Sequence, residues 1–150
     1  MHDIIILVML LANMLPYEDQ RAAIAYSEVY VPELHEGMPA ILTVYDPSLG
    51  GINCDNDCRT TATGLLTDDL YEKAGACHPS LLGATIYFDD INFSLTCVDT
   101  GGMVGVGWSK RDQEFVVFFD ALWHLSVEGG KITGGPSWNY FFLQNWRVEW

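Results

Sequence analysis

Positive charge is scarce in this 150-residue sequence. Seven lysines and arginines stand against twenty aspartates and glutamates, and the formal net charge is −13. A protein that binds nucleic acid needs a basic surface to displace counterions from phosphates, and so few cations cannot supply one. Anionic lipid headgroups would repel the same acidic surface. The charge balance therefore argues against nucleic-acid partners and fits a neutral or mixed-charge substrate such as a carbohydrate, although charge alone does not select one.

Common catalytic and metal-binding signatures are also missing. The sequence contains no Gly-x-Ser-x-Gly, no His-Glu-x-x-His and no phosphate-binding loop. The acidic run Asp55-Asn56-Asp57 lacks the glycine and the later glutamate of a calcium-binding loop, so we expect an acidic turn there. The sequence predicts no metal and no other cofactor.

The apolar run at the start of the chain is short. Residues 4–15 are apolar except for Asn13, which is too short a run for a typical membrane-spanning helix but suits a signal peptide. Ala23-Ile24-Ala25 has the small-x-small form of a cleavage site, although no Lys or Arg precedes the run. We expect residues 1–25 to be an export or anchor segment of a secreted or envelope-associated protein. The alternative is an N-terminal helix packed on the domain.

Long helical patterns are scarce after residue 30, whereas glycine, aromatic residues and short β-prone runs are common. Residues 26–39 are polar, and Pro32 stops any continuous helix, so we expect a linker there. Residues 40–150 then form one mainly β domain, a small barrel or sandwich of about seven strands. Strands are expected over 40–45, 84–88, 93–98, 115–119, 138–143 and 146–150, with a further apolar stretch at 103–108.

The chain has four cysteines, at positions 54, 58, 77 and 97. An even number in a short, acidic, glycine-rich chain indicates disulfides in an exported protein, with three connectivities to choose from. We expect Cys54–Cys58, which closes a small acidic loop, and Cys77–Cys97, which ties two core segments together. A zinc site is the alternative, although Cys-x3-Cys followed by two isolated cysteines lacks the second paired knuckle of a structural zinc site.

One aspartate stands out at the end of the β-prone run 93–98. Asp99 is followed by Thr100 and by two glycines, Gly101 and Gly102. Paired glycines let the backbone turn sharply without a steric penalty from a side chain. We therefore expect the Asp99 carboxylate at a rigid strand end that a bulky substrate can approach. The alternative is an ordinary turn in which Asp99 hydrogen-bonds its own loop.

Several segments, in chain order, resemble the motifs of the 3D (Asp-Asp-Asp) domain family. They are Thr61-Ala62-Thr63-Gly64, Ala76-Cys77-His78-Pro79, Leu82-Gly83-Ala84-Thr85-Ile86 and Cys97-Val98-Asp99-Thr100-Gly101-Gly102. The family includes the C-terminal part of the membrane-bound lytic transglycosylase A group and bacterial stationary-phase survival proteins. The resemblance covers residues 40–150 and implies a six-stranded double-psi β-barrel. It also implies a secreted bacterial protein that cleaves peptidoglycan or a related polysaccharide.

Of the family's three aspartates, the second matches here as Asp99. The first position falls on His78. The third falls on Val116, in the strand over 115–119 that resembles the family's last catalytic strand, and the nearest acidic residue to that strand is Asp120. The resemblance thus implies Asp99 and Asp120 as the catalytic pair, with the acid/base carboxylate at Asp99. The residues expected to bind substrate are Thr61, Thr63, His78, Gly101 and Gly102.

The implied reaction needs a carboxyl group that is protonated near neutral pH. Lytic transglycosylases cleave the β-1,4 bond next to N-acetylmuramic acid with the muramic 6-hydroxyl instead of water, so one carboxyl serves first as acid and then as base. Apolar burial or a neighbouring carboxylate raises the pKa of such a group. Both conditions hold if Asp99 and Asp120 lie close together. The alternative function is a non-catalytic glycan-binding or structural β module that has lost the catalytic aspartates.

Other side chains have two interpretations each. His78 is either a titrating partner of the pair or a loop histidine before Pro79. Trp108, Trp123 and Trp138 either stack on sugar rings or belong to the core.

Overall fold

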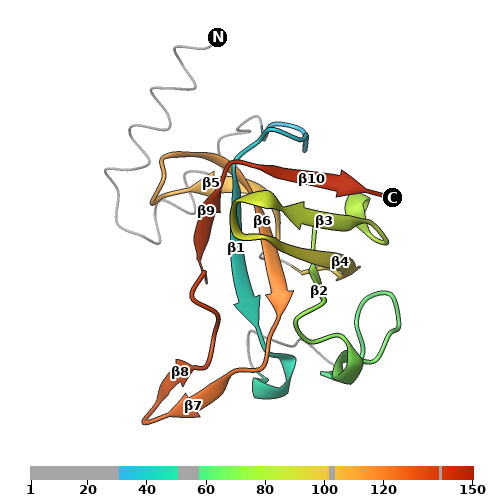
Figure 1. The fold of residues 1–150 in the computed structure, drawn as a ribbon, viewed down its shortest axis with the longest axis vertical. Helices are drawn as coiled ribbons and strands as arrows, with labels where there is room; N and C mark the ends of the chain where they lie inside the picture. The colour runs from blue at the N-terminus through green and yellow to red at the C-terminus, as the bar shows by residue number, and fades with distance from the viewer. Residues whose placement is uncertain (1–30, 51–57, 102–103, 139) are drawn as a thin grey trace.

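The computed structural model describes residues 31–50, 58–101, 104–138 and 140–150, and in these ranges the chain is mainly β (Figure 1), which confirms the predicted class. The predicted export segment, residues 1–25, lies outside them. The strands are β1 (Ala40–Tyr45), β2 (Ala74–Ala76), β3 (Thr85–Phe88), β4 (Phe93–Asp99), β5 (Gly105–Ser109), β6 (Glu114–Leu122), β7 (Ser126–Glu128), β8 (Lys131–Thr133), β9 (Phe141–Leu143) and β10 (Trp146–Glu149). Short 3-10 helices are η1 (Pro47–Leu49), η3 (Thr67–Asp69), η4 (Pro79–Leu81) and η5 (Asp89–Ile91). Within the described ranges no helix has the length and apolar character needed to cross a membrane.

Eight strands form the main sheet. Their order is β10-β3-β4-β2-β6-β1-β9, and β5 pairs with β6 beside this path. The pairs β1–β6 and β2–β4 are parallel, and the others are antiparallel. Strands β7 and β8 form a separate hairpin that projects from the body of the domain (Figure 1). The short strand β2 therefore lies between β4 and β6, near the middle of the sheet.

The sheet is not closed into the predicted six-stranded barrel. Its two end strands, β9 and β10, pair with β1 and β3 respectively and not with each other. Only Gln144 and Asn145 separate them in sequence, and both backbone amides donate to a side-chain oxygen of Asp90, at 3.0 and 3.1 Å. The Asp90 side chain thus ties the β9–β10 connection to η5, between β3 and β4.

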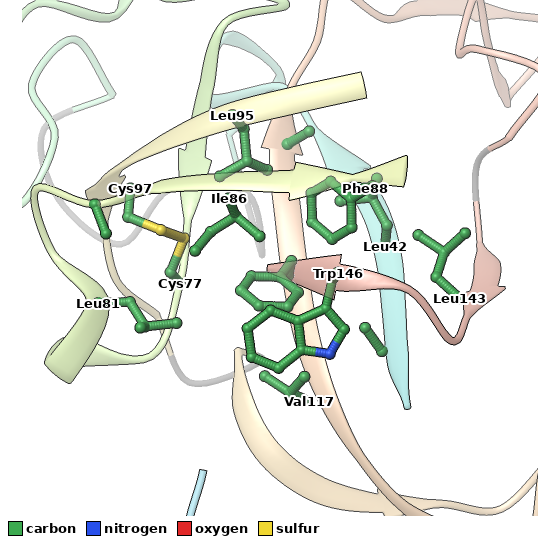
Figure 2. Close-up of a cluster of buried hydrophobic side chains, with 14 of the residues drawn as sticks. Leu42, Cys77, Leu81, Ile86, Phe88, Leu95, Cys97, Val117, Leu143 and Trp146 are labelled. Carbon is green, nitrogen blue, oxygen red and sulfur yellow. A yellow bond between two sulfur atoms is a disulfide. The ribbon is translucent and has the colours of Figure 1, made fainter. Parts of the chain in front are cut away.

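One face of the sheet forms the main hydrophobic core. Alternate residues of β6, namely Val117, Phe119 and Ala121, are buried in it, as the period of a strand requires. Figure 2 shows Trp146 lying within this cluster, and its indole nitrogen donates to the Met38 carbonyl at 2.5 Å. Met38 is itself buried in the core, so the end of the expected linker packs on the domain.

The opposite alternation builds a second, smaller cluster, which we call the site face. It consists of Tyr45, Ala74, Ala76, Val98 and Leu122. Leu122 of β6 and Tyr45 of β1 end neighbouring parallel strands, and the two residues are in register. Small side chains on β2 keep this face shallow at its centre.

The cysteine prediction is confirmed for one pair. Cys77 and Cys97 form a disulfide with their Cα atoms 5.6 Å apart. Because these two cysteines are oxidised, the alternative zinc site of four thiolates is not formed. Cys58 is also disulfide-bonded, and its predicted partner Cys54 lies outside the described residues.

Two of the tryptophans pack against each other. Trp123 and Trp138 meet edge to face, with ring centroids 5.2 Å apart, and both contact the ring of Phe93. Trp108 meets Phe115 edge to face in the same way. All three tryptophans are partly buried, so their rings contribute to packing.

Candidate functional site

Asp99 and Asp120 flank one small residue on the sheet. Ala76 of β2 is in register with Asp99 of β4 on one side and with Asp120 of β6 on the other. Thr43 of β1 follows in the same row, opposite Asp120. Since neighbouring strands are about 4.8 Å apart, the two aspartate Cα atoms are separated by about 10 Å. The structure therefore places the two aspartates that the sequence singled out in one row of the sheet, on either side of Ala76.

A β-bulge turns Asp99 onto the site face. Leu95 and Cys97 of β4 point into the main core, and regular alternation would send Asp99 there too. The register shifts between Gly75 and Ala76, so that β4 has one more residue than β2 at this point. The carboxylate instead meets Tyr45 of the site face. Bulges commonly redirect side chains in this way next to functional sites.

The Asp99 carboxylate accepts three hydrogen bonds. Its Oδ1 accepts from the Ala62 amide at 2.8 Å and from the Thr100 amide at 3.0 Å, and its Oδ2 accepts from the Tyr45 hydroxyl at 3.0 Å. The Thr100 contact is the local turn bond that the sequence offered as the alternative. The other two donors come from distant segments, so Asp99 is more than a turn residue.

Asp120 has very different surroundings. Among the described residues its hydrogen-bond donor is the Thr43 hydroxyl, 2.8 Å from Oδ1. Burial raises the pKa of this carboxyl to about 6, and the Thr43 hydrogen bond acts in the opposite direction. Burial is the larger effect because one neutral donor replaces little of the lost hydration. Asp120 is thus half protonated near pH 6.

Tyr45 lies between the two carboxyls and was not predicted. Burial raises its pKa well above the ordinary value, and the negative charges of Asp99 and Asp120 raise it further. The phenol therefore stays protonated and donates to Asp99. Thr43 and Tyr45 share one parity on a strand that the sequence did predict. That alternation was the available signal, but it does not say which face would hold the site.

The turn at Thr61 and Thr63 docks on the end of β4. The amide and hydroxyl of Thr63 both donate to the Val98 carbonyl, at 3.1 and 2.8 Å, and the two threonine hydroxyls are 3.1 Å apart. The Thr61 hydroxyl also accepts from the Leu65 amide. Both predicted substrate-binding hydroxyls are therefore already engaged, Thr61 within the turn and Thr63 also with β4. The group that the turn presents to the site is the Ala62 amide.

His78 has local hydrogen bonds and none to the carboxyl pair. Its Nδ1 caps η4 by accepting from the Ser80 amide at 3.2 Å, and it lies 2.7 Å from the Ser80 hydroxyl. A Cβ on Gly105 would come within 3.2 Å of the ring, so His78 packs closely on β5. This arrangement fits the loop-histidine interpretation.

The remaining predicted positions are quickly located. Gly101 is exposed just after the β4 strand end, and Gly102 lies outside the described residues. Val116, at the family's third aspartate position, is fully buried and in register with Gly107 of β5. No carboxylate replaces it there.

A third aspartate, which the sequence analysis did not single out, supports the end of β1 next to the site. Asp46 follows Tyr45 directly and is almost fully buried. Burial acts to raise its pKa, but hydrogen bonds from the Leu125 amide, the Ser48 amide and hydroxyl, and the Tyr71 hydroxyl outweigh it and hold the pKa below the ordinary value. Asp46 thereby ties the end of β1 to two other segments and fixes the backbone next to Tyr45.

Among the residues that the structure describes, no group of three or more His, Cys, Asp and Glu side chains is arranged to hold a metal ion. Comparison of the chain with protein-family models, with curated proteins and with solved structures gives no match.

Proposed function

We propose that this chain is a secreted, cell-wall-active protein that cleaves peptidoglycan glycan strands in the manner of a lytic transglycosylase. The proposal rests mainly on one observation: two carboxyls flank Ala76 on one face, one with a raised pKa and one that accepts three hydrogen bonds. Carboxyl groups with contrasting surroundings are typical of acid–base catalysis. The resemblance to the 3D domain family supplies the substrate.

In this proposal Asp120 is the acid. Its proton passes to the glycosidic oxygen as the bond from that oxygen to C1 breaks, which leaves positive charge on the muramic ring. The Asp99 carboxylate stabilises this charge, and the Tyr45 hydroxyl keeps Asp99 oriented. The muramic 6-hydroxyl then attacks C1 and gives its proton to the Asp120 carboxylate. The product is a 1,6-anhydro sugar, and Asp120 regains its proton.

The test is digestion of purified peptidoglycan followed by mass spectrometry. We expect 1,6-anhydromuropeptides from the wild type and none above background from Asp120→Asn or Asp99→Asn. Asp89→Asn is the matched control, because Asp89 is exposed on η5 and its ion-pair partner is Arg147, which does not belong to the site. No anhydro product from the wild type overturns the proposal.

A non-catalytic glycan-binding module is the second candidate. It is favoured by the two family positions at which His78 and Val116 stand where aspartates are expected, since Val116 is buried and leaves no carboxylate there. For this function we expect the wild type to sediment with insoluble peptidoglycan and to release no anhydro product.

A further inference from the structure

We infer that the Cys77–Cys97 disulfide is a positioning element for Asp99, because it fixes the bulge that turns this carboxyl onto the site face. The inference rests on the proposed role of Asp99, and it adds a covalent constraint to that role. Disulfides ordinarily stabilise the whole fold by constraining the unfolded chain. Here its place in the sheet points to a local effect.

The disulfide brackets the bulge on both strands. Cys97 of β4 is in register with Gly75, and the next aligned pair is Asp99 with Ala76. The extra residue is therefore Val98, directly after Cys97. On the other strand Cys77 directly follows Ala76. The covalent bond thus joins the residue before the bulge to the residue after the aligned alanine.

Three consecutive carbonyls of the bulge bind three different segments. The Cys97 carbonyl accepts from the Gly83 amide at 2.8 Å, the Val98 carbonyl from Thr63, and the Asp99 carbonyl from the Cys77 amide at 3.0 Å. The Cys77 segment is the one that is also bonded covalently to the bulged strand. Without that bond, the position of Asp99 depends on hydrogen bonds alone.

A β4 register without the bulge is costly, and this cost predicts how the protein responds when the disulfide is lost. A shift that restored regular alternation would send the Asp99 carboxylate toward the core occupied by Leu95 and Cys97. We therefore expect the bulge to loosen and not to flip. The donors to Asp99, the Ala62 and Thr100 amides, then exchange with solvent more readily.

The disulfide also belongs to the main core, so a local effect must be separated from a global one. Both cysteines are fully buried, and Figure 2 shows the bridge near Leu81 and Ile86 at one end of the cluster. A variant that removes core volume nearby but keeps the bridge is the appropriate control. Ile86→Ala meets this requirement.

The experiment is amide hydrogen exchange by NMR on the Cys77→Ala/Cys97→Ala double variant. We expect exchange at Ala62 and Thr100 to accelerate by about tenfold or more relative to the wild type, and the core-strand amides of Leu95 and Val117 to change much less. In Ile86→Ala we expect all four amides to accelerate together. Unchanged exchange at Ala62 and Thr100 overturns the inference, as does a uniform acceleration in a double variant that is folded.

A second route uses the wild type, in case the double variant does not fold. Dithiothreitol transfers two electrons to each disulfide that it reduces, which gives two protein thiols and cyclic oxidised dithiothreitol. Because the disulfide of Cys58 is reduced as well, Thr100, which directly follows Asp99, is the deciding probe. Thr100 should lose protection at lower reductant concentration than Leu95 and Val117, and simultaneous loss contradicts the inference. Neither route measures activity, so a wild type that releases no anhydro product overturns the proposed function and leaves this result standing.

Discussion

At the residue scale, the central feature is the contrast between two aspartates on one face. Asp99 accepts hydrogen bonds from two backbone amides and a tyrosine, whereas Asp120 is buried with one neutral donor. Burial without compensation disfavours the charged form of a carboxyl and raises its pKa. The burial that raises the pKa of Asp120 also makes its ionisation unfavourable for folding.

That cost predicts a pH-dependent effect of Asp120→Asn. The pKa of Asp120 is about 6 in the folded chain, against an ordinary 3.8, so the folded state binds more protons than the unfolded state between these values. Stability contributed by this group is present at low pH and is lost as pH rises through about 6. We expect Asp120→Asn to raise the free energy of unfolding by about 2 kcal/mol at pH 8 and to change it little at pH 4. Urea denaturation at both pH values measures this, and an equal effect at the two contradicts it.

At the element scale, the short strand β2 sets the spacing of the site. Its middle residue, Gly75, lies against β6 so closely that a Cβ there would be 2.4 Å from the Asp120 carbonyl and 3.0 Å from the Ala121 Cα. These are backbone atoms, which cannot rotate away. Only glycine lets β2 approach β6 at this point, and the approach places Ala76 between the two aspartates.

Gly75→Ala should therefore disrupt the site and destabilise the sheet. Because the clash is with backbone, we expect a loss of about 3 kcal/mol in the free energy of unfolding, together with loss of anhydro product. Gly101→Ala is the control, since a Cβ there meets nothing within 4 Å. Urea denaturation measures the stability of both variants, and peptidoglycan digestion measures the activity of Gly75→Ala. Equal stability of the two would show that β2 can move away from β6.

The end of β1 offers a second prediction at this scale. Asp46 holds β1 to the Leu125 and Tyr71 segments, and its pKa is lowered, so its stability contribution is present above pH 4 and is lost as pH falls through the folded pKa. We expect Asp46→Asn to lower the free energy of unfolding by about 2 kcal/mol at pH 7. As the pH is lowered, the stability of this variant should fall less steeply than that of the wild type. Thermal denaturation between pH 2 and pH 7 tests this prediction, with the exposed Asp68→Asn as control. An Asp46→Asn variant as stable as the wild type at pH 7 would contradict it.

At the scale of the whole molecule, local signals could be read from the sequence and long-range ones could not. The strands around residues 40–45, 93–98 and 115–119 were predictable because each is a β-prone run bounded by turn residues. Strand β2 was not, because Ala-Gly-Ala has no β-branched or aromatic residue. Sheet closure could not be predicted either. Closure depends on which strands pair at the edges of the sheet, and the alternation of apolar and polar residues within a strand does not identify its partners.

The candidate site shows the same division. The sequence identified Asp99 from its strand end and glycines, and Asp120 from its place near the last strand of the resemblance. It could not identify the bulge that reorients Asp99, since an extra residue is visible only against a partner strand. Thr43 and Tyr45 were missed for a related reason: parallel pairing with β6 brings them to Asp120 across more than seventy residues.

The central claim is that Asp120 donates a proton to a glycan, and the most direct measurement is the pH dependence of anhydromuropeptide release. Purified peptidoglycan is digested by the wild type and by Asp120→Asn from pH 4 to pH 8, with product quantified by mass spectrometry. Because the acid must be protonated, we predict that release by the wild type falls as pH rises through about 6, and that Asp120→Asn releases none at any pH. Release that does not change with pH, or that persists in Asp120→Asn, would contradict the account.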